Sequence, residues 1–202
     1  MSRTALLFIT AVLLGVVFTC NCLATEIIFN RCPTERYNLR ALSRSHGRDN
    51  SSGWFNNISI SKDGMLIAKG LEYGAIEPVD TQGKIIVDKI FLFDAPVTCT
   101  TFVLDDSHII AATAKGEIAL IDLATKKITK TINTKTKIYD IAYSYKTNSL
   151  AVASWDGRVV IINVDLFQIV STNKHDDGGV SCVTFSSDES ILVSGGADGS
   201  IY

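Results

Sequence analysis

The side chains most often used for metal binding and acid–base chemistry are few in this chain of 202 residues, and they are scattered. The three histidines, His46, His108 and His175, lie far apart in the sequence. A metal site needs clustered His, Cys or carboxylate ligands. The densest group is His175-Asp176-Asp177, whose carboxylates would offer oxygen ligands to a cation, but a solvated loop accounts for it as well. The sequence therefore predicts no metal site.

The motifs of nucleophilic and phosphate chemistry do not occur in the sequence either. No Gly-rich stretch ends in Gly-Lys-Ser or Gly-Lys-Thr, and no Gly-x-Ser-x-Gly segment is found. Asp156 and Asp198 each precede a glycine, Gly157 and Gly199, which marks them as turn residues and not as a general acid and base. We predict no catalytic residue, no cofactor and no enzymatic activity.

Five lysines gather in one short stretch and form the main charged feature of the chain. They are Lys126, Lys127, Lys130, Lys135 and Lys137. They would offer a basic patch to an anionic partner or a lipid surface. The alternative is structural, because outer strands of sheets carry lysine to prevent pairing with other chains. Both interpretations remain open from the sequence.

Charge also divides the chain near Trp54. Residues 1–53 hold six arginines and no lysine and carry a net charge of +3. Residues 54–202 hold thirteen basic and eighteen acidic side chains, a net charge of −5. Nucleic-acid binding proteins usually carry a marked basic excess, so we expect no nucleic-acid partner.

Residues 54–202 contain an internal repeat. Gly74, Gly116, Gly157 and Gly199 are separated by 42, 41 and 42 residues. The apolar or aromatic residues at Ile60, Phe102, Tyr143 and Phe185 keep the same spacing. Two independent landmarks with one period indicate four copies of one structural unit.

Each unit consists of short apolar runs separated by turns. In the third unit, expected strands at 138–144, 150–154 and 159–163 are joined by turns at Lys146-Thr147-Asn148 and Asp156-Gly157. An Asp-Gly pair between apolar runs is a strong hairpin signal, because glycine adopts positive φ without penalty. Helical periodicity is not evident after Trp54. The pattern predicts an all-β fold of four-stranded antiparallel units.

The repeat resembles the WD-repeat family of β-propellers, whose units are about 40–45 residues long. The pattern that the family shows in its first strand is matched here by Val180-Ser181-Cys182-Val183-Thr184-Phe185. The family's turn is matched by Asp156-Gly157-Arg158-Val159 and by Asp198-Gly199-Ser200-Ile201. The Trp-Asp pair that ends the third strand is degenerate here. Val79-Asp80, Ile121-Asp122 and Ile162-Asn163 stand in its place.

The resemblance also implies a hydrogen-bonded set of a loop His, a strand Ser and the turn Asp in each unit. In the third unit Ser154 and Asp156 fit this pattern. In the fourth unit His175 is the candidate, with Asp198 as its partner. The fold implied is an incomplete WD-repeat propeller of about three and a half blades, at 54–96, 97–137, 138–179 and 180–202.

The first 53 residues fall outside this pattern. Residues 1–24 hold Arg3, a mainly apolar run at 5–18, and Cys22-Leu23-Ala24, which is the layout of a secretory signal peptide. An uncleaved membrane anchor over Thr4–Ala24 and a buried N-terminus are the alternatives. Residues 25–53 are rich in Arg and Ser, which is typical of a linker or of an organelle transit segment.

These features predict a non-catalytic scaffold that binds other proteins. The number of units favours a fragment of a longer propeller, because propellers close with 4–8 blades. Self-assembly of arcs and an irregular four-bladed ring are the alternatives. The leader predicts a secretory, membrane-associated or plastid location, and a cytoplasmic one if it does not function. A membrane-tethered propeller and a propeller enzyme or small-molecule binder are the alternative functions.

Overall fold

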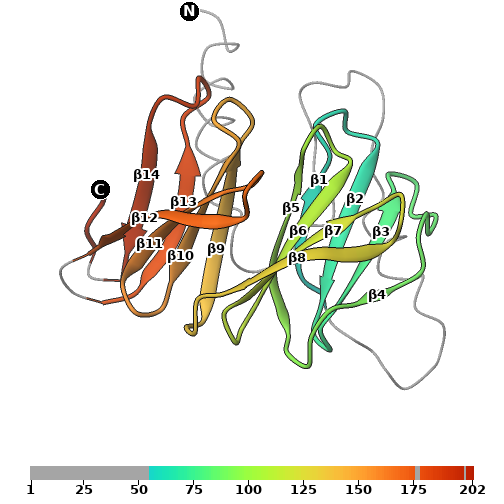
Figure 1. Ribbon diagram of the computed structural model, residues 1–202, viewed down its shortest axis with the longest axis horizontal. Helices are drawn as coiled ribbons and strands as arrows, with labels where there is room; N and C mark the ends of the chain where they lie inside the picture. Colours follow the sequence, from blue (N-terminus) through green and yellow to red (C-terminus); the bar gives the residue numbers. More distant parts are fainter. Residues whose placement is uncertain (1–54, 176–177, 198) are drawn as a thin grey trace, which may run out of the picture. The chain divides into compact units, whose positions relative to one another are not determined.

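Every secondary-structure element that the computed structural model describes is a β-strand (Figure 1). The structure describes residues 55–175, 178–197 and 199–202. The strands are β1 (Phe55–Ile60), β2 (Leu66–Leu71), β3 (Ala75–Asp80), β4 (Ile90–Phe91), β5 (Val97–Val103), β6 (His108–Thr113), β7 (Glu117–Asp122), β8 (Lys127–Asn133), β9 (Ile138–Ser144), β10 (Ser149–Ser154), β11 (Arg158–Asn163), β12 (Gln168–Lys174), β13 (Val180–Phe185) and β14 (Leu192–Gly196). The predicted all-β class is confirmed.

The strands form successive antiparallel sheets in chain order. Three sheets have four strands each, β1-β2-β3-β4, β5-β6-β7-β8 and β9-β10-β11-β12. The fourth sheet pairs β13 with β14, and Gly195 forms an isolated bridge with Ile201. Sequential antiparallel strands need only short turns, which the Gly and Asp residues of each unit supply. The predicted pattern of four-stranded units is therefore observed in the first three sheets.

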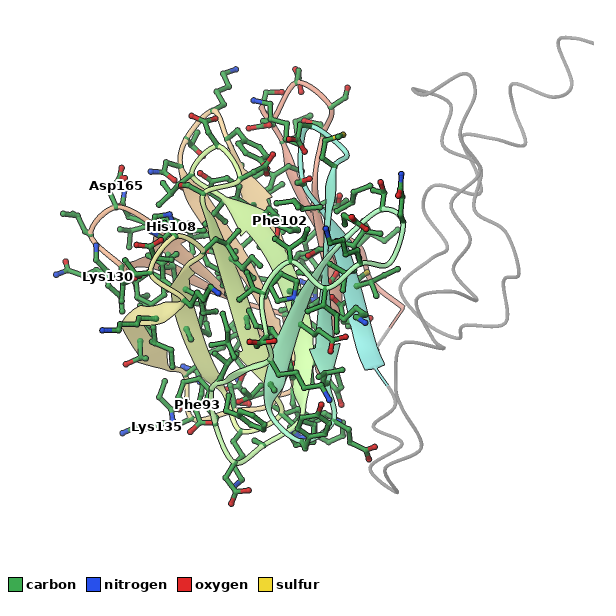
Figure 2. The ribbon with its side chains drawn as sticks, turned by 90° about the vertical axis from the view of Figure 1, so that its right-hand side faces the viewer. Phe93, Phe102, His108, Lys130, Lys135 and Asp165 are labelled. Carbon is green, nitrogen blue, oxygen red and sulfur yellow. The ribbon has the colours of Figure 1, made fainter. Side chains whose placement is uncertain are left out.

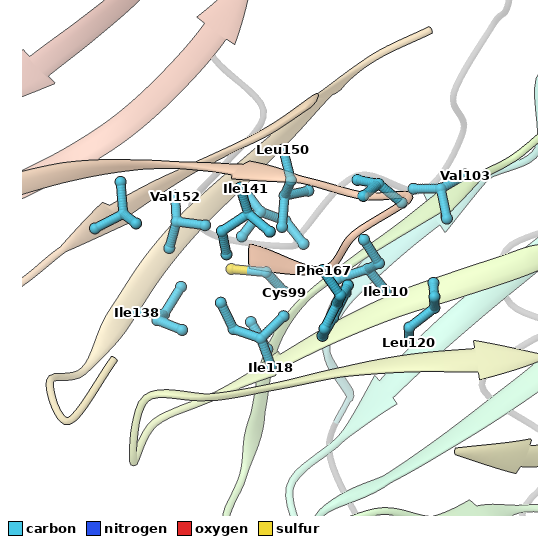
Figure 3. Close-up of a cluster of buried hydrophobic side chains, with 14 residues drawn as sticks. Cys99, Val103, Ile110, Ile118, Leu120, Ile138, Ile141, Leu150, Val152 and Phe167 are labelled. Carbon is cyan, nitrogen blue, oxygen red and sulfur yellow. The ribbon is translucent and has the colours of Figure 1, made fainter. Parts of the chain in front are cut away.

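Neighbouring sheets are held together by apolar side chains that fill the space between them. Figure 3 shows this core between the second and third sheets, where Ile110, Ile118 and Leu120 face Ile138, Leu150 and Val152. A second cluster lies between the first and second sheets and includes the buried Phe102. The middle strands of the second and third sheets are apolar on both faces because each of these sheets has a neighbouring sheet on both sides.

A side chain on the first strand of each complete sheet also bonds to the backbone of the next sheet. Asn57, Cys99 and Asp140 occupy equivalent positions in β1, β5 and β9. Asn57 Oδ1 accepts from the Thr100 N–H at 2.9 Å, and Asp140 Oδ2 accepts from the Val183 N–H at 3.0 Å. The Cys99 thiol donates to the Tyr139 carbonyl, with 3.2 Å between Sγ and O. We call these three contacts the inter-sheet joints.

The three joints differ in their protonation chemistry. Burial, reinforced by the nearby Asp140 charge, raises the pKa of Cys99 to about 12, so the thiol stays protonated and can donate. Burial also raises the pKa of Asp140 to about 6. The hydrogen bonds that Asp140 accepts from two backbone N–H groups act in the opposite direction, because they favour the charged form. Cys182 is the fourth member of this series and is exposed.

The first sheet is the least regular, and Pro78 is the reason. Pro78 pairs with Ala68 of β2, whereas β4 pairs only with Ala75 and Ile76. Because proline has no N–H to donate, the ladder with the outer segment is interrupted here, and pairing resumes only as an isolated bridge between Val79 and Ile85. The same sheet carries a buried ion pair between Lys69 and Glu77 on opposite strands.

Several sequence-based predictions fall on residues outside the described part of the chain. These are the leader at 1–24 with its candidate span Thr4–Ala24, and the segment at 25–53. The blade boundaries also stay predictions. Within residues 55–175, 178–197 and 199–202, no helix has the length and apolar character that crossing a membrane requires.

The substitution Asp140→Asn should stabilise the protein at neutral pH. The folded-state pKa of Asp140 lies above its usual value, so folding favours the protonated carboxyl group. The stability that this group contributes is full below about pH 4 and is lost as the pH rises through about 6. Asparagine keeps the acceptor for the Val183 N–H, as Asn57 does in the first joint, and removes the buried charge at the cost of the bond from the Ile141 N–H. We expect a gain of about 1–3 kcal/mol in unfolding free energy at pH 7.5 and little change at pH 4, measured by urea unfolding.

Asp188→Asn is the matched control for this prediction. Its hydrogen bonds from Ser186 and Ser190 hold the pKa of Asp188 at about 2, so neutralising it should give no gain at pH 7.5. A loss of stability in Asp140→Asn at both pH values would show that the joint needs the carboxylate charge.

Candidate functional site

The turn between β10 and β11 is fixed by a small polar network. The buried Ser154 hydroxyl lies 2.6 Å from Asp156 Oδ1, and Arg158 Nε donates to Asp156 Oδ2 at 2.6 Å. Partial burial raises the pKa of Asp156, but the hydrogen bond from Ser154 and the Arg158 guanidinium outweigh this effect. The net pKa is below the usual value, so the carboxylate is charged at neutral pH. Asp156 therefore serves its own turn.

Gly157 completes this turn by letting two segments approach closely. Its φ is +81°, and a Cβ at this position would lie 2.5 Å from the Gly178 carbonyl oxygen. Only glycine combines this conformation with this contact. The turn is thereby docked against the segment that leads into β13.

Trp155, inside this turn, places a large aromatic side chain in solvent. It is 64% exposed, and its ring centroid lies 5.8 Å from that of Tyr139. The Lys137 ammonium group lies over the Tyr139 ring, 5.0 Å from its centroid. An exposed Trp supported by a second aromatic ring and flanked by a cation resembles the anchors that dominate protein interfaces.

A shallow, open hollow of about 540 Å³ lies beside these rings. It is lined by Tyr139, Trp155, Asp156, Lys174, His175, Gly178, Gly179, Ser181 and Ala197. We call the hollow and its rim the Trp155 surface. The residues come from the third and fourth sheets, so the packing of β13 against β9 determines its shape.

His175 lies at the base of the Trp155 surface and is buried. Its Nε2 is 2.8 Å from the Ser194 hydroxyl, and its ring lies against that of Tyr202, with 4.1 Å between centroids and the two planes tilted by 51°. Its Nδ1 has no hydrogen-bond partner among the described residues. Asp198, the partner expected from the sequence, lies outside them, so that pairing stays a prediction.

The five lysines of the predicted basic patch do not gather in one place. Lys127 and Lys130 are on β8, and the Lys130 ammonium group donates to the Asp165 carbonyl of the next sheet. Lys135 and Lys137 follow β8, at the opposite end of a strand of roughly 20 Å. Figure 2 shows Lys130 near Asp165 and Lys135 well away from both. Only Lys137 reaches the Trp155 surface.

The sequence analysis missed Trp155 on this surface and Ser194, the hydrogen-bond partner of His175. A Trp directly before an Asp-Gly turn was a usable signal, because turn positions are exposed and normally polar. Ser194 had no comparable signal, since one buried Ser in an apolar strand looks like any other. Among the described residues, no three His, Cys, Asp or Glu side chains are grouped so that they could hold a metal ion.

The repeat pattern and fold match a known class of protein. Residues 126–163 and 167–202 match the family described as WD domain, G-beta repeat. These two segments, which include strands of the second, third and fourth sheets, are therefore similar to WD repeats. The four sheets are accordingly blades of an incomplete WD-repeat β-propeller, and we use that word for them from here on.

A more distant relative covers most of the chain. It is the U3 small nucleolar RNA-associated protein 18 homolog of Arabidopsis thaliana, which is 23% identical over 179 residues. The match takes in 86% of this chain but 33% of the relative, so the chain spans about one third of the relative's length.

The substitution Ser194→Ala should destabilise the fourth blade. It leaves the buried His175 Nε2 without a partner, and an unsatisfied buried group costs about 1–3 kcal/mol. Ser181→Ala on the neighbouring strand is the control, because this exposed hydroxyl donates only to the Gly195 carbonyl. We expect urea unfolding to separate the two variants by at least about 1 kcal/mol. Equal stabilities would mean that the His175–Ser194 bond contributes nothing net.

Proposed function

We propose that this chain is a non-catalytic scaffold that binds other proteins through the Trp155 surface. The observation that carries the proposal is the exposed Trp155 ring supported by Tyr139 beside an open hollow. Burying such a ring removes a large apolar area from water, and Trp is among the residues that contribute most to binding at interfaces.

The rigidity of the surface supports the same role. Gly157 and Gly179 both approach a neighbouring carbonyl too closely for any side chain, and Trp155 donates its backbone N–H to the Lys137 carbonyl at 2.9 Å. A surface fixed by backbone contacts loses little conformational entropy when a partner binds. This favours a binding platform over a catalytic site, where convergent titratable groups would be expected.

The distant relative suggests the kind of assembly in which such a scaffold would work. Its name associates it with the U3 small nucleolar RNA. We propose that this chain contacts protein components of an RNA-containing assembly, and not RNA itself, because residues 54–202 carry a net charge of −5.

The location of the protein depends on whether residues 1–24 act as a leader. A working leader would direct the chain to the secretory pathway, a membrane or a plastid, and would favour the membrane-tethered alternative. Without it, the chain would remain in the cytoplasm or reach the nucleolus. N-terminal sequencing of the mature protein decides between these locations, since a start at Thr25 shows cleavage and an intact Met1 excludes it.

Trp155→Ala should abolish partner binding while leaving the fold intact. The side chain is exposed, so we expect a change in unfolding free energy within about 0.5 kcal/mol. Met65→Ala is the matched control, because Met65 is 62% exposed and lies in the turn between β1 and β2 of the first blade. Quantitative capture of proteins by the full chain should show at least tenfold depletion of a defined set with Trp155→Ala only. Equal recovery with both variants would contradict the proposal.

A further inference from the structure

The outer strand of the third blade, β12, has an open edge. In the described residues it pairs only with β11, and all seven of its side chains are exposed. Its outer side therefore presents unpaired backbone N–H and C=O groups, which form a template for another strand. Leu166, Ile169 and Val170 add exposed apolar area at one end, with exposed fractions of 66%, 49% and 60%.

The equivalent strand of the second blade, β8, shows how such an edge is normally protected. Both strands carry a bulge at the same place, and their ladders align residue by residue. β8 has Lys127, Thr129 and Lys130 where β12 has Gln168, Val170 and Ser171. Charged side chains on an edge strand oppose pairing, so β8 is protected and β12 is not.

The charge pattern also selects the occupant. If two copies of β12 pair antiparallel about Ser171, Gln168 lies opposite Lys174 and Ile169 lies opposite Asn173, so no like charges face each other. The same arrangement of β8 would place two Lys130 side chains directly opposite, which is destabilising. An antiparallel pair of identical strands satisfies both open edges with one two-fold contact.

We propose that β12 is a self-association edge, at which two copies of this chain join their third blades into one continuous sheet. The contact uses backbone hydrogen bonds along Gln168–Lys174 and the apolar side chains of Ile169 and Val170. A contact of this small area gives a weak dimer. It meets the Trp155 surface only at Lys174, the last residue of β12, and does not include Trp155 itself.

Two identical substitutions at equivalent positions test the proposal. Thr172→Lys places a charge beside the two-fold axis on β12, and Thr131→Lys places the same charge on β8. Both side chains are exposed. In sedimentation equilibrium of the full chain, we expect the wild type and Thr131→Lys to dimerise alike and Thr172→Lys to weaken the dimer at least tenfold. A wild type that is monomeric at 100 µM overturns the proposal, as does an equal effect of the two variants.

A milder variant covers the case in which Thr172→Lys does not fold. Val170→Thr gives β12 the residue that β8 carries at its bulge, and circular dichroism would verify its fold. We expect it to weaken the dimer several-fold. A folded Val170→Thr variant with wild-type association would overturn the proposal. The Trp155→Ala variant should dimerise normally, which separates this contact from partner binding.

Discussion

The inter-sheet joints are the interaction on which the rest of this structure depends. Strands within a blade are held by backbone ladders, but among the described residues no backbone ladder connects one blade to the next. That connection relies on apolar packing and on side-chain hydrogen bonds, of which those of Asn57, Cys99 and Asp140 recur at one position of the first strand. Each satisfies a backbone group on the inner edge of the next blade, which would otherwise lack a partner within the fold.

The joints also help to shape the Trp155 surface. This surface takes Tyr139 from β9, Trp155 from the turn between β10 and β11, and Ser181 from β13. Tyr139 is adjacent to Asp140, and Ser181 is two residues before Val183, so the third joint holds the two halves of the surface in register. A change in protonation at Asp140 therefore acts on a contact that borders the binding surface.

Much of the fold was predictable because the middle strands of the first three blades are largely buried on both faces. Continuous apolar runs such as Val159–Ile162 and a period of 41–42 residues sufficed to place them. The strand expected at 138–144 coincides with β9. The outer strands gave no such signal: all seven residues of β12 are exposed, so its sequence carries neither an apolar run nor strict alternation.

The site was less predictable because it depends on contacts between units. Ser154 and Asp156 bond within one turn, and local spacing was enough to pair them. The His175–Ser194 bond joins residues 19 positions apart across two blades, and the Lys69–Glu77 pair is buried against expectation for charged strand residues. Spacing along a sequence does not reveal which strand lies against which, so such contacts need the fold.

Amide hydrogen exchange at Val183 tests the joint most directly. The Val183 N–H lies on the inner edge of β13 and is accepted by the Asp140 carboxylate at 3.0 Å. We expect this proton to be as protected as those within the ladders, and Asp140→Ala to remove its protection while leaving the β9–β10 amides other than Ile141 unchanged. If Val183 exchanges equally slowly in the Asp140→Ala variant, the side chain does not hold the blades together and the account is contradicted.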